Sequence, residues 1–208
     1  MDEQVEGSRV HQLLHRATLS LRERTARLRL RGVDWLGRGA RVDGAPFVES
    51  FGAITIGDDF RLSSTPDQSH LVTGRDGVIT IGDRVSIGPG AAIAAELRVV
   101  IGNGAQIGPY AMIMDTDFHD IEDMRASSSA QPVVIEDDVR IGGRVTILKG
   151  VRIGRGAWIA AGSVVSRAIP AGAFAAGVPA REVWLAICEV QGVPASRRYG
   201  VGLREPRK

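Results

Sequence analysis

Large aliphatic residues recur at every sixth position between residues 135 and 165. A helical stripe repeats every 3.6 residues and a half-buried strand every two, so neither produces this period. A hexapeptide repeat is typical of a β-helix, in which each unit is a short strand plus a corner. With three units to a turn, we expect Ile135 to stack on Ile153 and Ile141 on Ile159. The row consists of Ile135, Ile141, Ile147, Ile153, Ile159 and Val165.

The same period begins near Leu36 and predicts five to six turns in total. It slips by two residues between Ile54 and Ile56, and again between Val99 and Ile101. A slip of two keeps the same strand face inward. Residues 63–77 are rich in turn formers and predict a loop that interrupts the repeat.

Residues 9–31 combine leucines at mostly helical spacing with many arginines, which predicts an amphipathic basic helix. We favour a helix that caps the open end of the solenoid and covers its strand edges. The alternative is attachment to an anionic membrane surface. The predicted organisation is an N-terminal helical segment at 1–34, a β-helix at 35–170 and a C-terminal extension at 171–208.

Composition narrows the function classes. A single cysteine, Cys188, excludes an internal disulfide and fits a reducing compartment. The chain has no apolar run as long as a membrane span, and its first residues lack a signal-peptide pattern, so we expect a cytoplasmic protein. The net charge of +2 gives little support for a nucleic-acid partner. Because His70 and His119 are the only histidines of the coil region, no metal site is expected.

A polar insertion interrupts the regular repeat. Ile113 and Ile135 are 22 residues apart, four more than a full turn. Insertions in repeat proteins map to loops, and loops on rigid scaffolds often carry function. The plain alternative is a solvated surface loop. Its notable side chains are Asp115, Asp117, His119, Glu122 and Arg125.

The sequence resembles the hexapeptide-repeat acyltransferases, in the branch of sugar O-acetyltransferases. The matching segments are DTDFH at 115–119, Arg125, and the stretch at 132–183 that includes GSVVSRAIP and AAGVPAR. The resemblance implies an all-β fold, a left-handed parallel β-helix with a short N-terminal helical cap and a C-terminal extension. It also implies an acyl-CoA donor, usually acetyl-CoA, and a homotrimer with active sites between subunits.

The family's catalytic histidine matches His119. A hydroxyl that attacks a thioester must lose its proton, and a neutral imidazole is a suitable base at cytoplasmic pH. The oxyanion then needs a hydrogen-bond donor, for which the N–H of Gly142 or Gly143 is the candidate. Asp117 and Glu122 are candidates to orient the imidazole or bind the acceptor.

The resemblance also places the remaining site residues. The CoA positions match Gly143, Ala161, Ser166, Arg167 and Arg181. The two arginines suit phosphate groups. The predicted acceptor-binding residues are Asp115, Arg125 and Arg140. Relatives often have a tryptophan where this chain has Arg140, so this cation favours an anionic acceptor, or it is simply an exposed side chain.

The predicted function is O-acetyl transfer from acetyl-CoA, or another short acyl-CoA, to a sugar, glycan or related molecule. One alternative is N-acyl transfer to an amino sugar or sugar nucleotide. A second, from another class, is a non-catalytic structural β-helix, which would have no use for His119.

Overall fold

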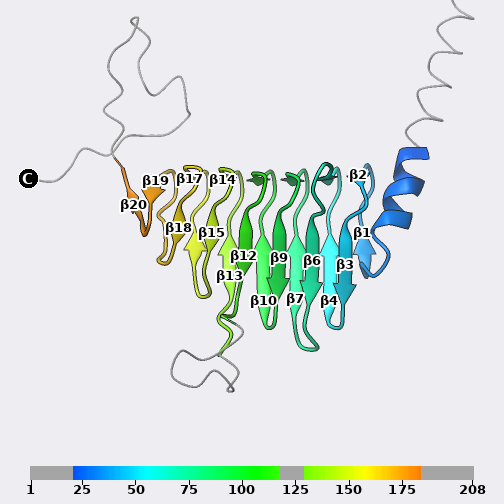
Figure 1. The fold of residues 1–208 in the computed structure, drawn as a ribbon, viewed down its shortest axis with the longest axis horizontal. Helices are drawn as coiled ribbons and strands as arrows, with labels where there is room; N and C mark the ends of the chain where they lie inside the picture. Colours follow the sequence, from blue (N-terminus) through cyan, green and yellow to red (C-terminus); the bar gives the residue numbers. More distant parts are fainter. Residues whose placement is uncertain (1–20, 118–128, 184–208) are drawn as a thin grey trace, which may run out of the picture.

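The computed structural model describes residues 21–117 and 129–183, which form a parallel β-helix (Figure 1). Its strands lie in three sheets, and sheets A and C have six strands each, so the chain makes about six turns. Sheet A contains β1 (Trp35–Leu36), β4 (Ala53–Ile56), β7 (Val78–Ile81), β10 (Arg98–Ile101), β13 (Val133–Ile135) and β16 (Arg152–Ile153). Sheet B contains β2 (Arg41–Gly44), β5 (Arg61–Ser64), β8 (Ser86–Ile87), β11 (Gln106–Ile107), β14 (Arg140–Ile141), β17 (Trp158–Ile159), β19 (Phe174–Gly177) and β20 (Ala180–Glu182). Sheet C contains β3 (Phe47–Ser50), β6 (His70–Thr73), β9 (Ala92–Ala95), β12 (Met112–Met114), β15 (Thr146–Ile147) and β18 (Val164–Val165).

The six-residue period fixes the register between neighbouring coils. Ile135 pairs with Ile153, and Ile141 pairs with Ile159, as the sequence predicts. Ile147 pairs with Val165 on the third sheet, and its side chain is fully buried. The core is therefore a narrow column of stacked aliphatic side chains.

Both slips in the period have the same structural cause. Ile54 and Ile56 are both buried because β4 is four residues long and its side chains alternate between core and solvent. Val99 and Ile101 occupy the equivalent positions in β10. A slip therefore marks a longer strand with two inward positions, and the coil continues through it.

The predicted loop at 63–77 is wrong for six of its fifteen residues, which lie in strands: 63–64 at the end of β5, and 70–73. It contains β6, whose Leu71 pairs with Val48 in the preceding coil and with Ile93 in the following one. Only the corner between β5 and β6 is irregular. This corner is longer than a regular one, so Leu71 falls outside the six-residue period and its strand is missed.

The N-terminal helix packs against the first coil. Residues 21–29 are helical, and Ala26 and the adjoining Leu30 are buried in the core. The Arg29 guanidinium donates to the carbonyl oxygen of Val42 over 2.6 Å, and the Gly39 N–H donates to Glu23 Oε1 over 2.8 Å. The rest of the predicted helix, residues 9–20, lies outside the described residues.

The opposite end of the solenoid extends past residue 170. β19 continues sheet B in parallel beside β17, and β20 then turns back to pair antiparallel with β19. In the described ranges, no helix is long and apolar enough to cross a membrane.

Candidate active site

The polar insertion rises from a rigid base. The carboxylate of Asp115 is fully buried and accepts three backbone hydrogen bonds of 2.6–2.8 Å, from Glu96, Leu97 and Arg98 in the preceding coil. Its carbonyl oxygen accepts from the N–H of Gln131, which closes the other end of the insertion. Asp115 is a predicted acceptor-binding residue, but these contacts give it a structural role, and we leave it out of the acceptor site.

Asp117 stands at the exposed start of the insertion. Its carboxylate forms an ion pair of 2.6 Å with the ammonium of Lys149, which lies in the following coil. This contact ties the first residues of the insertion to the next corner of the solenoid. Three other predicted residues of the insertion, His119, Glu122 and Arg125, lie outside the described residues.

The corner that joins sheet B to sheet C, here called the B–C corner, holds two of the predicted CoA positions. Its second residue is Pro89, Pro109, Gly143 and Ala161 in four successive coils. The prolines have no N–H to offer. The N–H groups of Gly143 and Ala161 have no hydrogen-bond acceptor in the part of the chain that the structure describes. Two free backbone donors therefore occupy adjacent coils, about 4.8 Å apart at the spacing of paired strands.

The first residue of this corner is already committed to the fold. The Gly142 N–H donates to the Ile159 carbonyl oxygen over 2.9 Å, so it is not available for a ligand. A Cβ at Gly142 would lie 2.5 Å from the backbone nitrogen of Ala161, which explains why glycine is required there. Of the two predicted oxyanion donors, only Gly143 remains a candidate.

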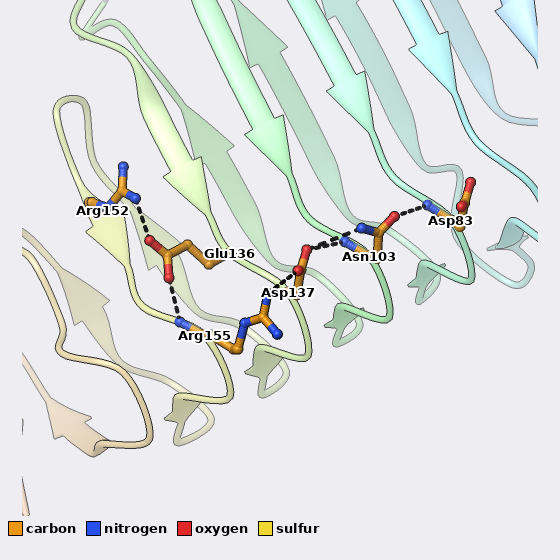
Figure 2. Close-up of polar contacts among 6 residues, drawn as sticks. All are labelled: Asp83, Asn103, Glu136, Asp137, Arg152 and Arg155. Carbon is orange, nitrogen blue, oxygen red and sulfur yellow. Dashed lines mark hydrogen bonds and ion pairs between the residues drawn. The ribbon is translucent and has the colours of Figure 1, made fainter.

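The corner between sheets A and B contrasts with the B–C corner. In several coils, the N–H of its second residue donates to a side chain of the following coil over 2.8 Å. Figure 2 shows part of this ladder and the arginines at its end. There the Arg155 N–H, together with the guanidinium of Arg152, holds the pKa of Glu136 below its usual value. The accepting side chains are those of Asp58, Asp83, Asn103 and Asp137.

The other predicted CoA residues lie at the C-terminal end of the solenoid. Arg181 of β20 pairs with Ala176 of β19. The residue before Ala176 is Ala175, whose carbonyl oxygen accepts a hydrogen bond from the N–H of Ala160 at the B–C corner. Arg181 therefore lies close to the B–C corner, two strands beyond the level of Ala161. Ser166 and Arg167 follow β18 and are exposed on the next corner, at the other edge of sheet C. The structure thus brings Gly143, Ala161 and Arg181 into one row but does not place the Ser–Arg pair on it.

A tyrosine–arginine pair beside the free donors is not found by sequence reasoning. Tyr110 and Arg144 follow Pro109 and Gly143 directly, and the Arg144 guanidinium lies 5.1 Å from the centre of the Tyr110 ring. The Tyr110 hydroxyl donates to Asp67 over 2.5 Å, and this hydrogen bond raises the pKa of Tyr110. Both residues have positive φ, which the sequence does not signal at non-glycine positions.

Arg140 has an aromatic neighbour that sequence reasoning also misses. It pairs in register with Trp158, and its guanidinium lies 5.7 Å from the centre of the indole ring. Trp158 in turn meets Phe174 edge-on at 5.9 Å between ring centres. The aromatic group that relatives often place at position 140 is therefore supplied one coil later. Within the described residues, no three His, Cys, Asp or Glu side chains gather as a metal site.

Comparison with known proteins decides the family. A family model described as the hexapeptide repeat of succinyl-transferase matches residues 132–167, and a model for a family of unknown function matches 153–196. A hexapeptide-repeat acetyltransferase from Vibrio cholerae O1 biovar eltor, solved with acetyl coenzyme A, is 30% identical. The likeness covers 75% of this chain and 73% of that one, with a TM-score of 0.51. The chain belongs to the hexapeptide-repeat acyltransferase family.

Two further proteins to which this chain is similar differ in the acceptor that their names give. A 2,3,4,5-tetrahydropyridine-2,6-dicarboxylate N-acetyltransferase of Staphylococcus aureus is 56% identical over 55 residues, which is 26% of this chain. The matched stretch spans 23% of the length of that relative. A maltose O-acetyltransferase from Clostridium difficile 630 shares the fold, with 23% identity, a TM-score of 0.50, and coverage of 79% of this chain and 84% of that chain.

Proposed function

We propose that this protein transfers an acetyl or other short acyl group from acyl-CoA to a hydroxyl of a sugar, glycan or related small molecule in the cytoplasm. The observation that carries the proposal is the pair of free N–H donors at Gly143 and Ala161, on a corner whose earlier coils have proline. Acyl-CoA carries amide and thioester carbonyl groups along its pantetheine arm. Two backbone donors in adjacent coils suit such a chain lying along the corner.

The chemistry assigns one role to each group. His119 takes the proton of the acceptor hydroxyl as the oxygen attacks the thioester carbon. The Gly143 N–H donates to the oxyanion of the tetrahedral intermediate. When the carbon–sulfur bond breaks, the departing CoA thiolate takes the proton back from the imidazolium. Arg140 and Arg125 are the proposed cations for an anionic acceptor, and Glu122 is proposed to orient His119.

The geometry supports a homotrimer in which neighbouring copies complete each site. The insertion with His119 leaves sheet C at the edge opposite the B–C corner. Within one chain, about six residues of a coil separate the B–C corner from the start of the insertion, and they span up to about 20 Å. In a trimer, His119 of one copy would instead face the B–C corner of a neighbouring copy, so that base and donor would be close together. The outer face of sheet C suits such a contact, because Glu49 and His70 are the only ionisable side chains at the outward positions of its described strands. The others are Phe47, Val72, Ala92, Ala94, Met112, Met114, Thr146 and Val164.

N-acyl transfer to an amino sugar or sugar nucleotide is the second candidate. It is favoured by the 55-residue match to an N-acetyltransferase, and the same donor corner and base would serve an amine. An assay with acetyl-CoA and a mixture of hydroxyl and amine acceptors separates the two. A product that mild alkali cleaves is an ester and supports O-transfer, whereas an alkali-resistant amide supports N-transfer. No product and no acetyl-CoA binding would favour the structural β-helix.

Arg181, beside the donor row, is expected to bind the phosphates of CoA, and Arg167, at the other edge of sheet C, is expected to reach the CoA of a neighbouring copy in the proposed trimer. A charge-assisted hydrogen bond contributes about 1.5–3 kcal/mol. Arg167→Ala or Arg181→Ala should therefore weaken CoA affinity by roughly 10- to 150-fold in calorimetry. A pantetheine donor without the nucleotide should lose much less. Arg155→Ala is the matched control, because Arg155 pairs with Asp137 at a different corner. If both variants bind CoA as the wild type does, the phosphate end is assigned incorrectly.

A further inference from the structure

The N-terminal helix exposes an apolar ridge on the side away from the solenoid. Leu21 and Leu28 are 62% and 61% exposed, whereas Ala26 and Leu30 are buried against the first coil. Leu21 and Leu28 are seven residues apart, just under two helical turns, so they lie on one face. A helix that served only as a cap would not need leucines on its solvent side.

Arginines line both sides of this ridge. Residues 21–31 carry five arginines and one carboxylate, that of Glu23, which accepts from the Gly39 N–H. On one side, a cavity of about 470 Å³ between the helix and sheet B is lined by four arginines and one acid, Asp43. In the described part of the chain, none of these four arginines forms an ion pair. They are Arg22, Arg29, Arg41 and Arg61.

The other side of the helix adds an aromatic side chain to the cations. A second cavity, of about 550 Å³, is lined by Arg27, Arg31 and Arg38, with the acids Asp34 and Asp58. Trp35 borders this cavity and is 67% exposed. Phe51, in the same first coil, is 66% exposed. Exposed tryptophan beside arginine is the side-chain chemistry typical of the boundary between water and lipid.

We propose that this end of the solenoid docks onto an anionic lipid bilayer. The ridge of Leu21 and Leu28 enters the interface with Trp35, and the flanking arginines bind headgroup phosphates. A free phosphate or a nucleic acid would explain the arginines but would leave the leucines and Trp35 without a role. The proposed donor corner lies towards the far end of the solenoid, near β19, so acyl-CoA would still reach it from solution (Figure 1).

Co-sedimentation of the full chain with vesicles tests this proposal without any acyl transfer, so its failure is distinguishable from failure of the proposed function. Vesicles of phosphatidylcholine alone are compared with vesicles that contain a third of phosphatidylglycerol. We expect binding to the anionic vesicles only, and weaker binding as salt rises, because salt screens the arginines. Absence of binding to anionic vesicles at low salt would overturn the proposal.

Three variants separate the apolar and the charged contributions. Leu21→Ser/Leu28→Ser keeps the charge, and Arg24→Glu/Arg27→Glu reverses two exposed arginines; each should weaken vesicle binding roughly tenfold or more. Arg75→Glu/Arg98→Glu makes the same charge change at exposed positions of later coils, outside both cavities, and should bind nearly as the wild type does. Circular dichroism verifies folding of all three. Equal loss in the control, no loss in the leucine variant, or release by millimolar glycerol phosphate would each contradict a bilayer site.

Discussion

His119→Ala is expected to lower the turnover number by about 10²- to 10⁴-fold while leaving the affinity for acetyl-CoA nearly unchanged. The proposed base takes a proton from the acceptor and does not hold the donor. Acetyl transfer is followed by release of the CoA thiol, and donor affinity by calorimetry. The wild-type rate under acceptor-limited conditions should rise with pH through one ionisation in the histidine range, because only neutral imidazole accepts a proton.

His119→Asn is the matched control for this variant. The amide keeps some hydrogen bonding but does not accept a proton at neutral pH, so its turnover should be nearly as low as that of the alanine variant. If His119→Asn keeps most of the wild-type turnover while chemistry limits the rate, His119 only positions the acceptor. The base would then be sought at Asp117, Glu122 or a residue of a neighbouring copy.

His119→Ala, combined with Gly143→Pro, also tests whether neighbouring copies share a site. Gly143→Pro changes the proposed donor corner and His119→Ala changes the proposed base, and each alone should be slow. In trimers that contain both variants, some interfaces combine an intact corner with an intact base. Co-expression should therefore recover a measurable part of the wild-type activity. No recovery in verified mixed trimers would mean that one chain supplies both groups.

Asp115→Ala is expected to have the second large effect, on stability. The buried carboxylate accepts three backbone N–H groups, and its removal leaves them without an acceptor. Each unsatisfied buried donor costs about 1–3 kcal/mol, so we expect a loss on the order of 3–5 kcal/mol in the free energy of unfolding, measured with denaturant. The base of the insertion would loosen as well, so turnover should also fall.

Asp115→Asn separates the loss of hydrogen bonds from the loss of side-chain volume. An asparagine keeps the shape and one oxygen, which can still accept from Leu97 and Arg98, while its NH₂ group would face the Glu96 N–H. Its stability should therefore fall between those of wild type and Asp115→Ala. An alanine variant as stable as the wild type would show that the buried carboxylate is not needed to hold the coils together.

The core could be predicted because the solenoid repeats one local rule. Inward aliphatics at a fixed period determine both the strands and their register, as the pairing of Ile141 with Ile159 shows. The rule fails where a corner changes length, as at residues 65–69, because the six-residue period was the only signal that located the strands. Leu71 is as buried as any core residue but lies outside the period.

The candidate site is less accessible from sequence because it depends on which backbone groups stay unpaired. Nothing local distinguishes the N–H of Gly142 from that of Gly143, yet one donates to Ile159 and the other has no acceptor in the described ranges. Asp115 has contacts that its place in the sequence does not indicate. A carboxylate in a polar insertion suggests acceptor binding, whereas its partners come from residues 96–98, one coil earlier. Those contacts depend on the stacking of coils and not on neighbouring sequence.

The most direct test of the account is calorimetric titration of Gly143→Pro with acetyl-CoA. Proline already follows glycine at this corner in two earlier coils, as Pro89 and Pro109, so the fold should accept the change. The substitution removes the one N–H that the account gives to the thioester end of the donor. The account predicts a folded protein whose acetyl-CoA affinity falls by roughly 2- to 12-fold, the effect of one neutral hydrogen bond, and whose turnover falls by about 10²–10³. A folded variant with wild-type affinity and wild-type turnover would contradict it.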